Sequence, residues 1–205
     1  QEIVTFATQM AIADKATGAI SYQDVMLNKD ESNRPDTVLE GLTSLKPVIE
    51  GGVVTAGNAS QLSDGASACV VMEAALAQRR GLQALGIYRG MTVAGCAPEE
   101  MGIGPIYAVP KLLKQHGLKI DDIGLWELNE AFAVVGIANT KILEIDPAKV
   151  DVNGGAVALG HPLGNSGSRV IVTLINVLKQ NNAKIGGAGI CNGGGGASAM
   201  IIENI

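Results

Sequence analysis

Segments typical of strands and segments typical of helices alternate along this chain from about Gln61 to its end, and this alternation constrains the fold most strongly. Strands are expected at residues 66–74, 87–97, 123–129 and 150–155, with a closing hairpin formed by 184–196 and 198–205. Helices are expected at residues 75–82, 103–117, 131–145 and 168–182. The pattern predicts an α/β fold, a layered αβα domain with a parallel or mixed sheet covered by helices. The helix at 131–145 is so apolar that burial on most sides is expected.

Residues 1–60 are polar, rich in turn formers and weakly periodic. They are expected to form loops with short elements, including a short helix near 37–42 after Arg34 and Pro35. The domain prediction is therefore a loop region at 1–60 followed by an α/β domain at 61–205.

Charge and composition exclude several classes of function. The net charge is −5, aromatic residues make up 3% of the chain, and no basic run is present, which argues against nucleic-acid binding. No apolar run reaches the roughly 18 residues of a membrane span, and no signal peptide is seen. The three cysteines are irregularly spaced, which favours neither a disulfide framework nor a zinc site. A reducing compartment follows, with a cytoplasmic location expected and the mitochondrial matrix as the alternative.

Glycines cluster near residues 51–57, 154–167 and 186–196, where close approach of another group to the backbone is expected. The second cluster, GGAVALGHPLGNSGSRV, holds His161 at the start of a predicted helix. Three roles of His161 remain open at this point: a general base, a hydrogen-bond donor, or a structural histidine in a tight turn.

Three other features are candidates for chemistry. Cys191 precedes four glycines at a strand end, where a thiol is either reactive or simply a small buried apolar group. Asn129 either caps the helix expected to start near Glu130 or orients a substrate carbonyl, and Glu130 complements the helix dipole. The small-residue stretch 55–67 either approaches a ligand or packs tightly. Four further residues are given structural roles: Cys69 and Trp126 in the core, Cys96 at a strand end, and His116 as a solvated cap.

Taken together, these motifs resemble the thiolase family, and most closely its acetyl-CoA acetyltransferase branch. The residues that carry the resemblance are Gly57-Asn58-Ala59-Ser60, Asn129-Glu130-Ala131-Phe132, Gly160-His161-Pro162 with Gly164, Ser166 and Gly167, and Cys191 with Gly193-Gly194-Gly195. Their order and spacing match the family over the whole chain.

The resemblance implies a role for each motif in reversible Claisen condensation of acetyl-CoA and thiolysis of 3-ketoacyl-CoA. His161 is implied to activate a nucleophilic cysteine and, with a water held by Asn129, to hold the thioester oxygen. Cys191 is implied to move the proton at C2 of acetyl-CoA, and the Gly193 N–H to stabilise a second oxyanion. These groups are the kind that Claisen chemistry requires.

The resemblance also implies contacts with coenzyme A, which is a substrate and not a covalently bound cofactor. Arg34 matches a nucleotide contact, Ala56 and Ser60 line the pantetheine channel, and Ala131 and Phe132 form its wall. Some relatives hold a potassium ion near the equivalents of Ala56, Gly57, Ala59 and Val157, but no metal site is predicted from the residues.

The family's nucleophilic cysteine belongs to an N-terminal half that mirrors the C-terminal half, and none of the three cysteines lies in a matching context. The chain is therefore expected to be the C-terminal half of a thiolase, inactive alone, with the N-terminal half as its partner and a homo-oligomer as its assembly. Without that half, Phe132 and Val135 are expected to be exposed. Two alternatives remain: a non-catalytic acyl-CoA-binding or interaction module, and a ketoacyl synthase, which Cys191 disfavours.

Overall fold

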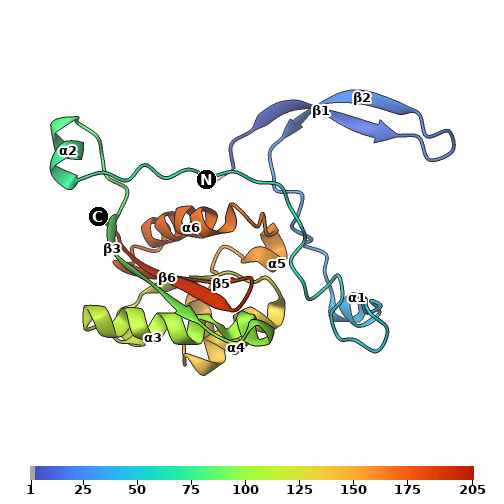
Figure 1. The fold of residues 1–205 in the computed structure, drawn as a ribbon. Helices are drawn as coiled ribbons and strands as arrows, with labels where there is room; N and C mark the ends of the chain where they lie inside the picture. Colours follow the sequence, from blue (N-terminus) through green and yellow to red (C-terminus); the bar gives the residue numbers. More distant parts are fainter. Residues whose placement is uncertain (1–2) are drawn as a thin grey trace. The chain divides into compact units, whose positions relative to one another are not determined.

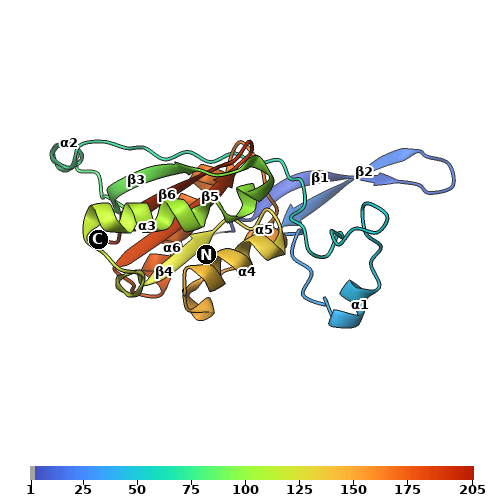
Figure 2. The same ribbon diagram turned by 60° about the horizontal axis from the view of Figure 1, so that its bottom comes forward.

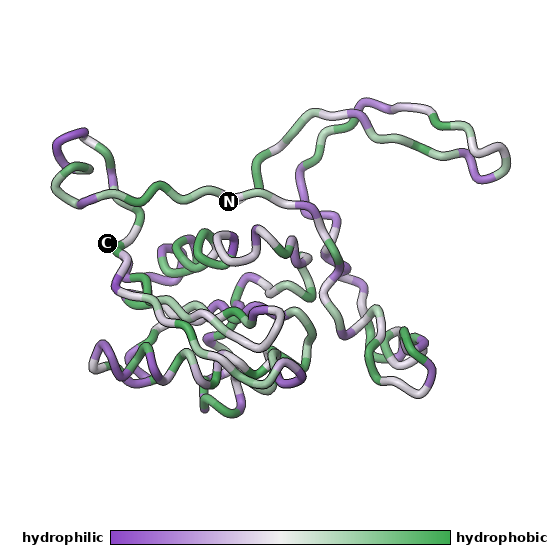
Figure 3. The backbone as a smooth tube through the Cα atoms, viewed as in Figure 1, coloured by the Kyte–Doolittle hydropathy of each residue, from purple (hydrophilic) through white to green (hydrophobic). Residues whose placement is uncertain are grey.

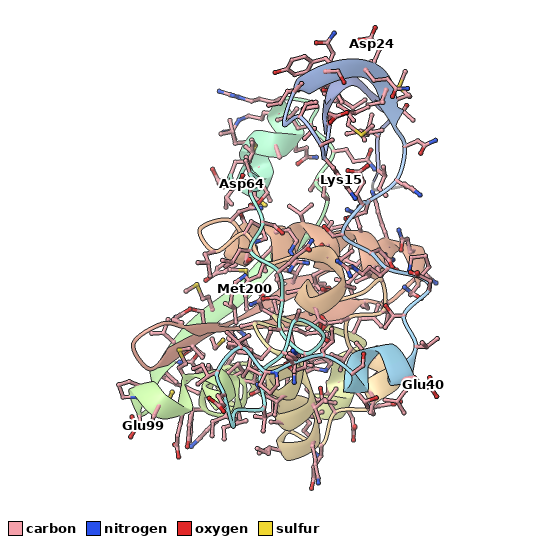
Figure 4. The ribbon with its side chains drawn as sticks, turned by 90° about the vertical axis from the view of Figure 1, so that its right-hand side faces the viewer. Lys15, Asp24, Glu40, Asp64, Glu99 and Met200 are labelled. Atoms are coloured by element: carbon pink, nitrogen blue, oxygen red, sulfur yellow. The ribbon has the colours of Figure 1, made fainter. Side chains whose placement is uncertain are left out.

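A computed structural model of the chain describes residues 3–205, which form two compact units, one ending at Asp36 and the other running from Thr37 to Ile205. The first unit is an antiparallel hairpin of β1 (Phe6–Ala13) and β2 (Ile20–Leu27). Its side chains project outward, including Lys15 and Asp24 (Figure 4). The sequence analysis missed both eight-residue strands, although Phe6, Met10, Ile12, Val25 and Leu27 lie on one face of the hairpin.

The second unit contains a four-stranded mixed sheet in the order β3-β6-β5-β4. The strands are β3 (Ile87–Gly95), β4 (Leu125–Leu128), β5 (Ile185–Asn192) and β6 (Gly196–Glu203). β4 and β5 are parallel, and the other two pairings are antiparallel. The expected α/β architecture and closing hairpin are confirmed.

Helices cover both faces of this sheet (Figure 1). α3 (Pro105–His116) and α4 (Ala133–Ile142) lie on one face, and α5 (Ala156–Leu159) and α6 (Ser166–Gln180) lie on the other. α1 (Leu39–Thr43) and α2 (Ala74–Arg79) lie away from the sheet, and short 3₁₀ turns are found at Pro98–Ile103, Ile120–Asp122 and Pro147–Lys149. Gly117, with φ of 65°, ends α3 as a left-handed cap, which is the position expected from the sequence.

The core lies in two layers, one on each side of the sheet. On one side α3 packs against β3 and β6, and Leu112, Trp126 and Ile201 are buried together. On the other side α6 packs against β4 and β5, and Leu174 and Ile202 are buried there. Figure 1 shows α3 and α6 on opposite sides of the strands, and Figure 2 shows α3 and α4 over the face that comes forward. The predicted core position of Trp126, which is 2% exposed, is confirmed.

Two predicted strands do not form. Residues 66–73 make no strand pairing, Ala74 begins α2, and Val70 and Val71 are 85% and 81% exposed. Cys69 in this run is exposed, so its predicted core position is wrong; Figure 3 shows the run leading to α2 in hydrophobic colours. Residues 150–155 make only one bridge, from Val150 to Trp126, before the chain turns away. An apolar run becomes a strand only where a partner edge takes its backbone hydrogen bonds.

The burial expected of the apolar helix also differs from the structure. α4 buries Val135 and half-buries Phe132, the two residues expected to be exposed. It instead exposes Val134 at 65% and Ile137 at 66%. The helix therefore buries one face, with Val135 and Asn139, and leaves the apolar residues of its other face uncovered in this chain.

We expect the chain to self-associate in solution, because Val134, Ile137 and the extended Val70 and Val71 are all more than half exposed. Light scattering should give a mass above the 21.0 kDa of one chain. Val134→Gln with Ile137→Gln should reduce this mass if α4 contributes to the contact. A monodisperse 21.0 kDa species of the unaltered chain would contradict the prediction.

Gly187→Ala is expected to destabilise the sheet, because a Cβ at Gly187 would overlap the buried Trp126 ring. Overpacking of this kind typically costs about 1–3 kcal/mol, which urea unfolding would measure. Gly167→Ala in α6 is the matched control, since no atom lies within 4 Å of its added Cβ. The control should be neutral or slightly stabilising, because alanine favours a helix over glycine. Equal effects of the two substitutions would contradict this explanation.

Candidate active site

His161 lies between the short helix α5 and the longer helix α6. It follows Gly160, whose φ of 92° and close contact with the Ser63 side chain leave no place for a larger residue. The His161 N–H donates to the Gln61 carbonyl at 3.0 Å, so the segment after Ser60 and the glycine loop run side by side. The histidine is therefore held by backbone contacts on both sides.

The hydrogen bonds of the imidazole define which nitrogen is basic. Nδ1 lies 2.5 Å from the Ser166 hydroxyl, and this hydroxyl donates its own hydrogen to the Pro162 carbonyl at 3.1 Å. Because the hydroxyl hydrogen is already used, Nδ1–H is the donor to Ser166 Oγ. Nε2 then carries the lone pair, and the Asn129 amide Nδ2 faces it at 3.4 Å. The ring thus presents a basic Nε2 beside a side-chain amide.

Asn129 directly follows β4 and is 3% exposed. Its backbone N–H donates to the Gly189 carbonyl of β5 at 2.9 Å, which continues the strand pairing by one residue. Of the two roles left open for Asn129, that of helix cap is wrong: α4 starts at Ala133, and its N-cap residue Phe132 makes no side-chain cap bond. The Asn129 Oδ1 atom is buried without a protein partner, so it is open to a donor from a water or a ligand.

Cys191 reaches the same end of the sheet from the neighbouring strand. β4 and β5 are parallel with Leu128 opposite Gly189, so Asn129 and Cys191 both lie at the carboxyl ends of these strands. Cys191 is partly buried, and it pairs with Ala197 near the end of β5, just before the turn to β6. Gly193 is exposed in this turn, and Gly194 and Gly195 adopt φ of 88° and 94°, which favours glycine.

Burial shifts the pKa values of both candidate catalytic groups toward the neutral form. The pKa of His161 is lowered by burial and then by the positive charge of Arg169, so the imidazole is neutral at pH 7. The pKa of the Cys191 thiol is raised by burial, with a further small rise from Cys96. The structure therefore places a neutral base and a protonated thiol in the same region.

An open pocket of about 650 Å³ borders His161. The glycine loop forms one wall with Pro162 and Asn165, and the segment after Ser60 forms the other with Ser63 and Asp64. Asp64 is labelled on this segment in Figure 4. Polar atoms from both walls therefore face the space next to the imidazole.

Four of the residues predicted to contact coenzyme A lie close together in the sequence or in space. Ser60 donates its N–H and its hydroxyl to the Ala131 carbonyl, at 3.1 and 2.9 Å. Ala59 forms a bridge with Phe132, and Ala56 is exposed a few residues earlier. Arg34 belongs to the first compact unit, so the structure does not place it relative to these residues.

Three residues next to this site were not recognised in the sequence. Gln61 accepts from the His161 backbone, Arg169 acts on the imidazole by its charge, and Asp151 contacts the end of β4. No local pattern marks any of them, because each contributes through a contact with a distant segment. Glu130 does not lie in a first helical turn as expected; its Oε2 accepts from the Val157 N–H at 3.2 Å. Among residues 3–205, no group of three acidic, histidine or cysteine side chains could hold a metal ion.

Family comparisons agree with this geometry. Residues 82–204 match the C-terminal domain of thiolase, and residues 7–75 match the N-terminal domain of thiolase. The chain therefore belongs to the thiolase family. No helix in the described part of the chain is both long and apolar enough for a membrane crossing.

Individual relatives show which members of the thiolase family this chain is similar to. The mitochondrial acetyl-CoA acetyltransferase of Rattus norvegicus is 51% identical over 185 residues, covering 89% of this chain and 43% of the relative. The Bacillus anthracis acetyl-CoA acetyltransferase structure aligns with a TM-score of 0.85 and 41% identity, over 97% of this chain and 49% of that one. The structure of a human mitochondrial 3-ketoacyl-CoA thiolase in complex with CoA aligns with a TM-score of 0.80 and 41% identity, over 88% of this chain and 46% of that one. The chain spans about half the length of the curated relatives that it matches.

Proposed function

We propose that this chain forms the C-terminal part of an acetyl-CoA C-acetyltransferase, which condenses two acetyl-CoA molecules reversibly and cleaves 3-ketoacyl-CoA with coenzyme A. The observation that carries the proposal is the His161–Asn129 pair at the carboxyl end of β4, with Cys191 at the same end of β5. The predicted division into a loop region at 1–60 and a C-terminal domain at 61–205 is part of this proposal. Its cytoplasmic or mitochondrial location stays a prediction.

In the proposed reaction, His161 Nε2 takes the proton of a nucleophilic cysteine thiol, and the thiolate attacks the thioester carbonyl of acetyl-CoA. Free coenzyme A leaves, and the acetyl group stays on the sulfur. The lone pair on Nε2 and the neutral state of the ring suit this role. The buried Asn129 Oδ1, which has no protein partner, suits a water that holds the thioester oxygen of the next substrate.

The second half of the reaction involves Cys191. In thiolysis the Cys191 thiol delivers a proton to C2 of the departing acetyl-CoA, and in condensation the Cys191 thiolate removes that proton. A thiol pKa raised by burial favours the protonated form needed for cleavage. The Gly193 N–H, in a turn without side chains, supports the oxyanion of the acetylated nucleophile.

Coenzyme A is proposed to lie along Ser60, Ala131 and Phe132, with Ala56 and Arg34 as further contacts.

We propose that the nucleophilic cysteine comes from a thiolase segment outside these 205 residues. Cys69 lies in an exposed extended run, and Cys96 lies beyond β3, beside the turn that follows Cys191. The first experiment compares the intact mass of the purified protein with the mass encoded by its gene. A larger encoded chain should cleave acetoacetyl-CoA, whereas a 21.0 kDa product should do so only after a separate N-terminal thiolase half is added. No thiolysis in either case would overturn the proposal.

A further inference from the structure

Asp151 lies where the chain leaves the open edge of β4 and turns toward the glycine loop. Its backbone N–H donates to the Trp126 carbonyl at 2.9 Å, and its Oδ1 accepts from the Leu128 N–H at 2.9 Å. β4 is the last strand of the sheet, so this carboxyl caps the free edge of the strand one residue before Asn129. Asp151 has a φ of 47°, a conformation that aspartate and asparagine tolerate better than other side chains.

A second carboxyl, that of Glu130, links the other side of Asn129 to the same loop. Glu130 Oε2 accepts from Val157 N–H in α5, the short helix that leads to His161. Both carboxyls converge at Gly155: a Cβ there would lie 2.9 Å from Asp151 Oδ2 and nearer still to Glu130 Oε2. Gly155 is thus required because the two acids occupy the place of a side chain.

These contacts close a ring that contains the catalytic pair. Asp151 holds the end of β4 directly before Asn129, and Glu130, directly after Asn129, accepts from Val157 in α5. α5 leads to His161, and the His161 ring faces the Asn129 side chain at 3.4 Å. We propose that Asp151 is a positioning residue, acting as a neutral carboxylic acid that joins the end of β4 to the glycine loop and so sets Asn129 against His161. The assignment of Asn129 and His161 to catalysis rests on the proposed function, whereas the contacts of Asp151 do not.

The surroundings of Asp151 explain why its carboxyl holds a proton below about pH 7. Burial and, after it, the negative charge of Glu130 raise the pKa of Asp151 to about 7, against the lowering effects of the Leu128 N–H, the Glu127 side chain and the positive charge of Arg169. Glu127 on β4 is 1% exposed, and the guanidinium nitrogens of Arg169 on α6 are buried. Two charged carboxylates converging in this space would repel each other, and one proton between them removes the repulsion.

The proton has a consequence for stability. A folded-state pKa above the ordinary 3.8 means that the folded chain binds a proton that the unfolded chain releases. The stabilisation is complete below about pH 4 and is lost as the pH rises toward 7. The urea midpoint of the full 205-residue chain should therefore fall by about 1 M between pH 5 and pH 8.

Two substitutions separate the roles of the carboxyl. Asp151→Asn keeps the acceptor for the Leu128 N–H, adds an N–H donor that does not titrate, and suits the positive φ. This variant should therefore keep the stability of the unaltered chain and lose most of its pH dependence. Asp151→Ala removes the acceptor and should lower the midpoint at every pH. Asp121→Asn, at an exposed carboxylate, is the control and should leave the pH dependence unchanged.

Positioning is read from the imidazole, without any need for turnover. The chain has only two histidines, so the ring signals of His161 are assigned in NMR spectra by comparison with a His116→Ala variant. Asp151→Ala should shift the His161 ring signals and the Asn129 side-chain amide signals, and Asp151→Asn should restore them. Equal pH dependence of the unaltered chain and Asp151→Asn, or unshifted His161 and Asn129 signals in Asp151→Ala, would overturn the proposal. Neither result depends on whether the protein is a thiolase in activity.

Discussion

Replacing His161 with alanine is expected to lower the rate of acetoacetyl-CoA thiolysis by about 10³-fold in an enzyme that contains both this chain and its nucleophile. The basic Nε2, held in place by Ser166 at Nδ1, is the group that accepts the proton of the attacking thiol. Initial rates at saturating acetoacetyl-CoA and coenzyme A measure the effect. The loss should lie in kcat more than in KM, because the imidazole acts in the chemical steps.

His116 offers a matched control for this experiment. It is the only other histidine, in the last turn of α3, and its ring packs against Gly90 away from the proposed site. His116→Ala should leave the thiolysis rate nearly unchanged. A His161→Ala enzyme that retains more than a tenth of its activity would remove His161 from the role of base.

The pH dependence tests the same residue from another direction. Burial and the charge of Arg169 lower the pKa of His161 below the ordinary 6.5, so the ring remains unprotonated as the pH falls to 6.5. The acidic limb of the rate profile for acyl transfer should therefore lie below pH 6.5. Because a lowered imidazole pKa favours the neutral folded form, the stability that it contributes is lost as the pH falls, the reverse of the Asp151 effect.

Cys191→Ser is expected to lower condensation and thiolysis by roughly 10²–10⁴-fold, since a serine hydroxyl is a far weaker acid than a thiol. The variant should still transfer an acetyl group from acetyl-CoA to the nucleophile, because that step uses His161. Exchange of labelled coenzyme A into acetyl-CoA reports this first step. Exchange of the C2 hydrogens with deuterated water reports the step assigned to Cys191.

Cys69→Ser is the control, because Cys69 is exposed in the extended run before α2 and should not matter to either step. Equal loss of both exchange reactions in Cys191→Ser would assign Cys191 to a structural role. Coenzyme A binding should survive in all of these variants, since the residues proposed to contact it are elsewhere. A chain that binds coenzyme A but shows no exchange with any nucleophile-bearing partner would support the alternative of a binding module.

The residues that bring the site together come from three segments far apart in the sequence. The segment after Ser60 contacts both Ala131 and His161, and Asn129 lies between β5 and the imidazole. The sequence motifs identified Ser60, Asn129, His161 and Cys191 individually. The resemblance to the thiolase family implied acyl-transfer chemistry for them, but the hydrogen bonds that orient them required the fold.

The sequence by itself determined those elements whose signals are local. Gly117 ends α3, the glycine loop precedes α6, and glycines 193–195 turn β5 into β6, because backbone conformation and periodicity are encoded within a few residues. Only the tertiary structure decided the rest. The run at 66–74 finds no strand partner, Val135 faces inward, and the Asp151 carboxyl meets Leu128 and lies beside Glu130, because pairing, burial and charge depend on segments distant along the chain.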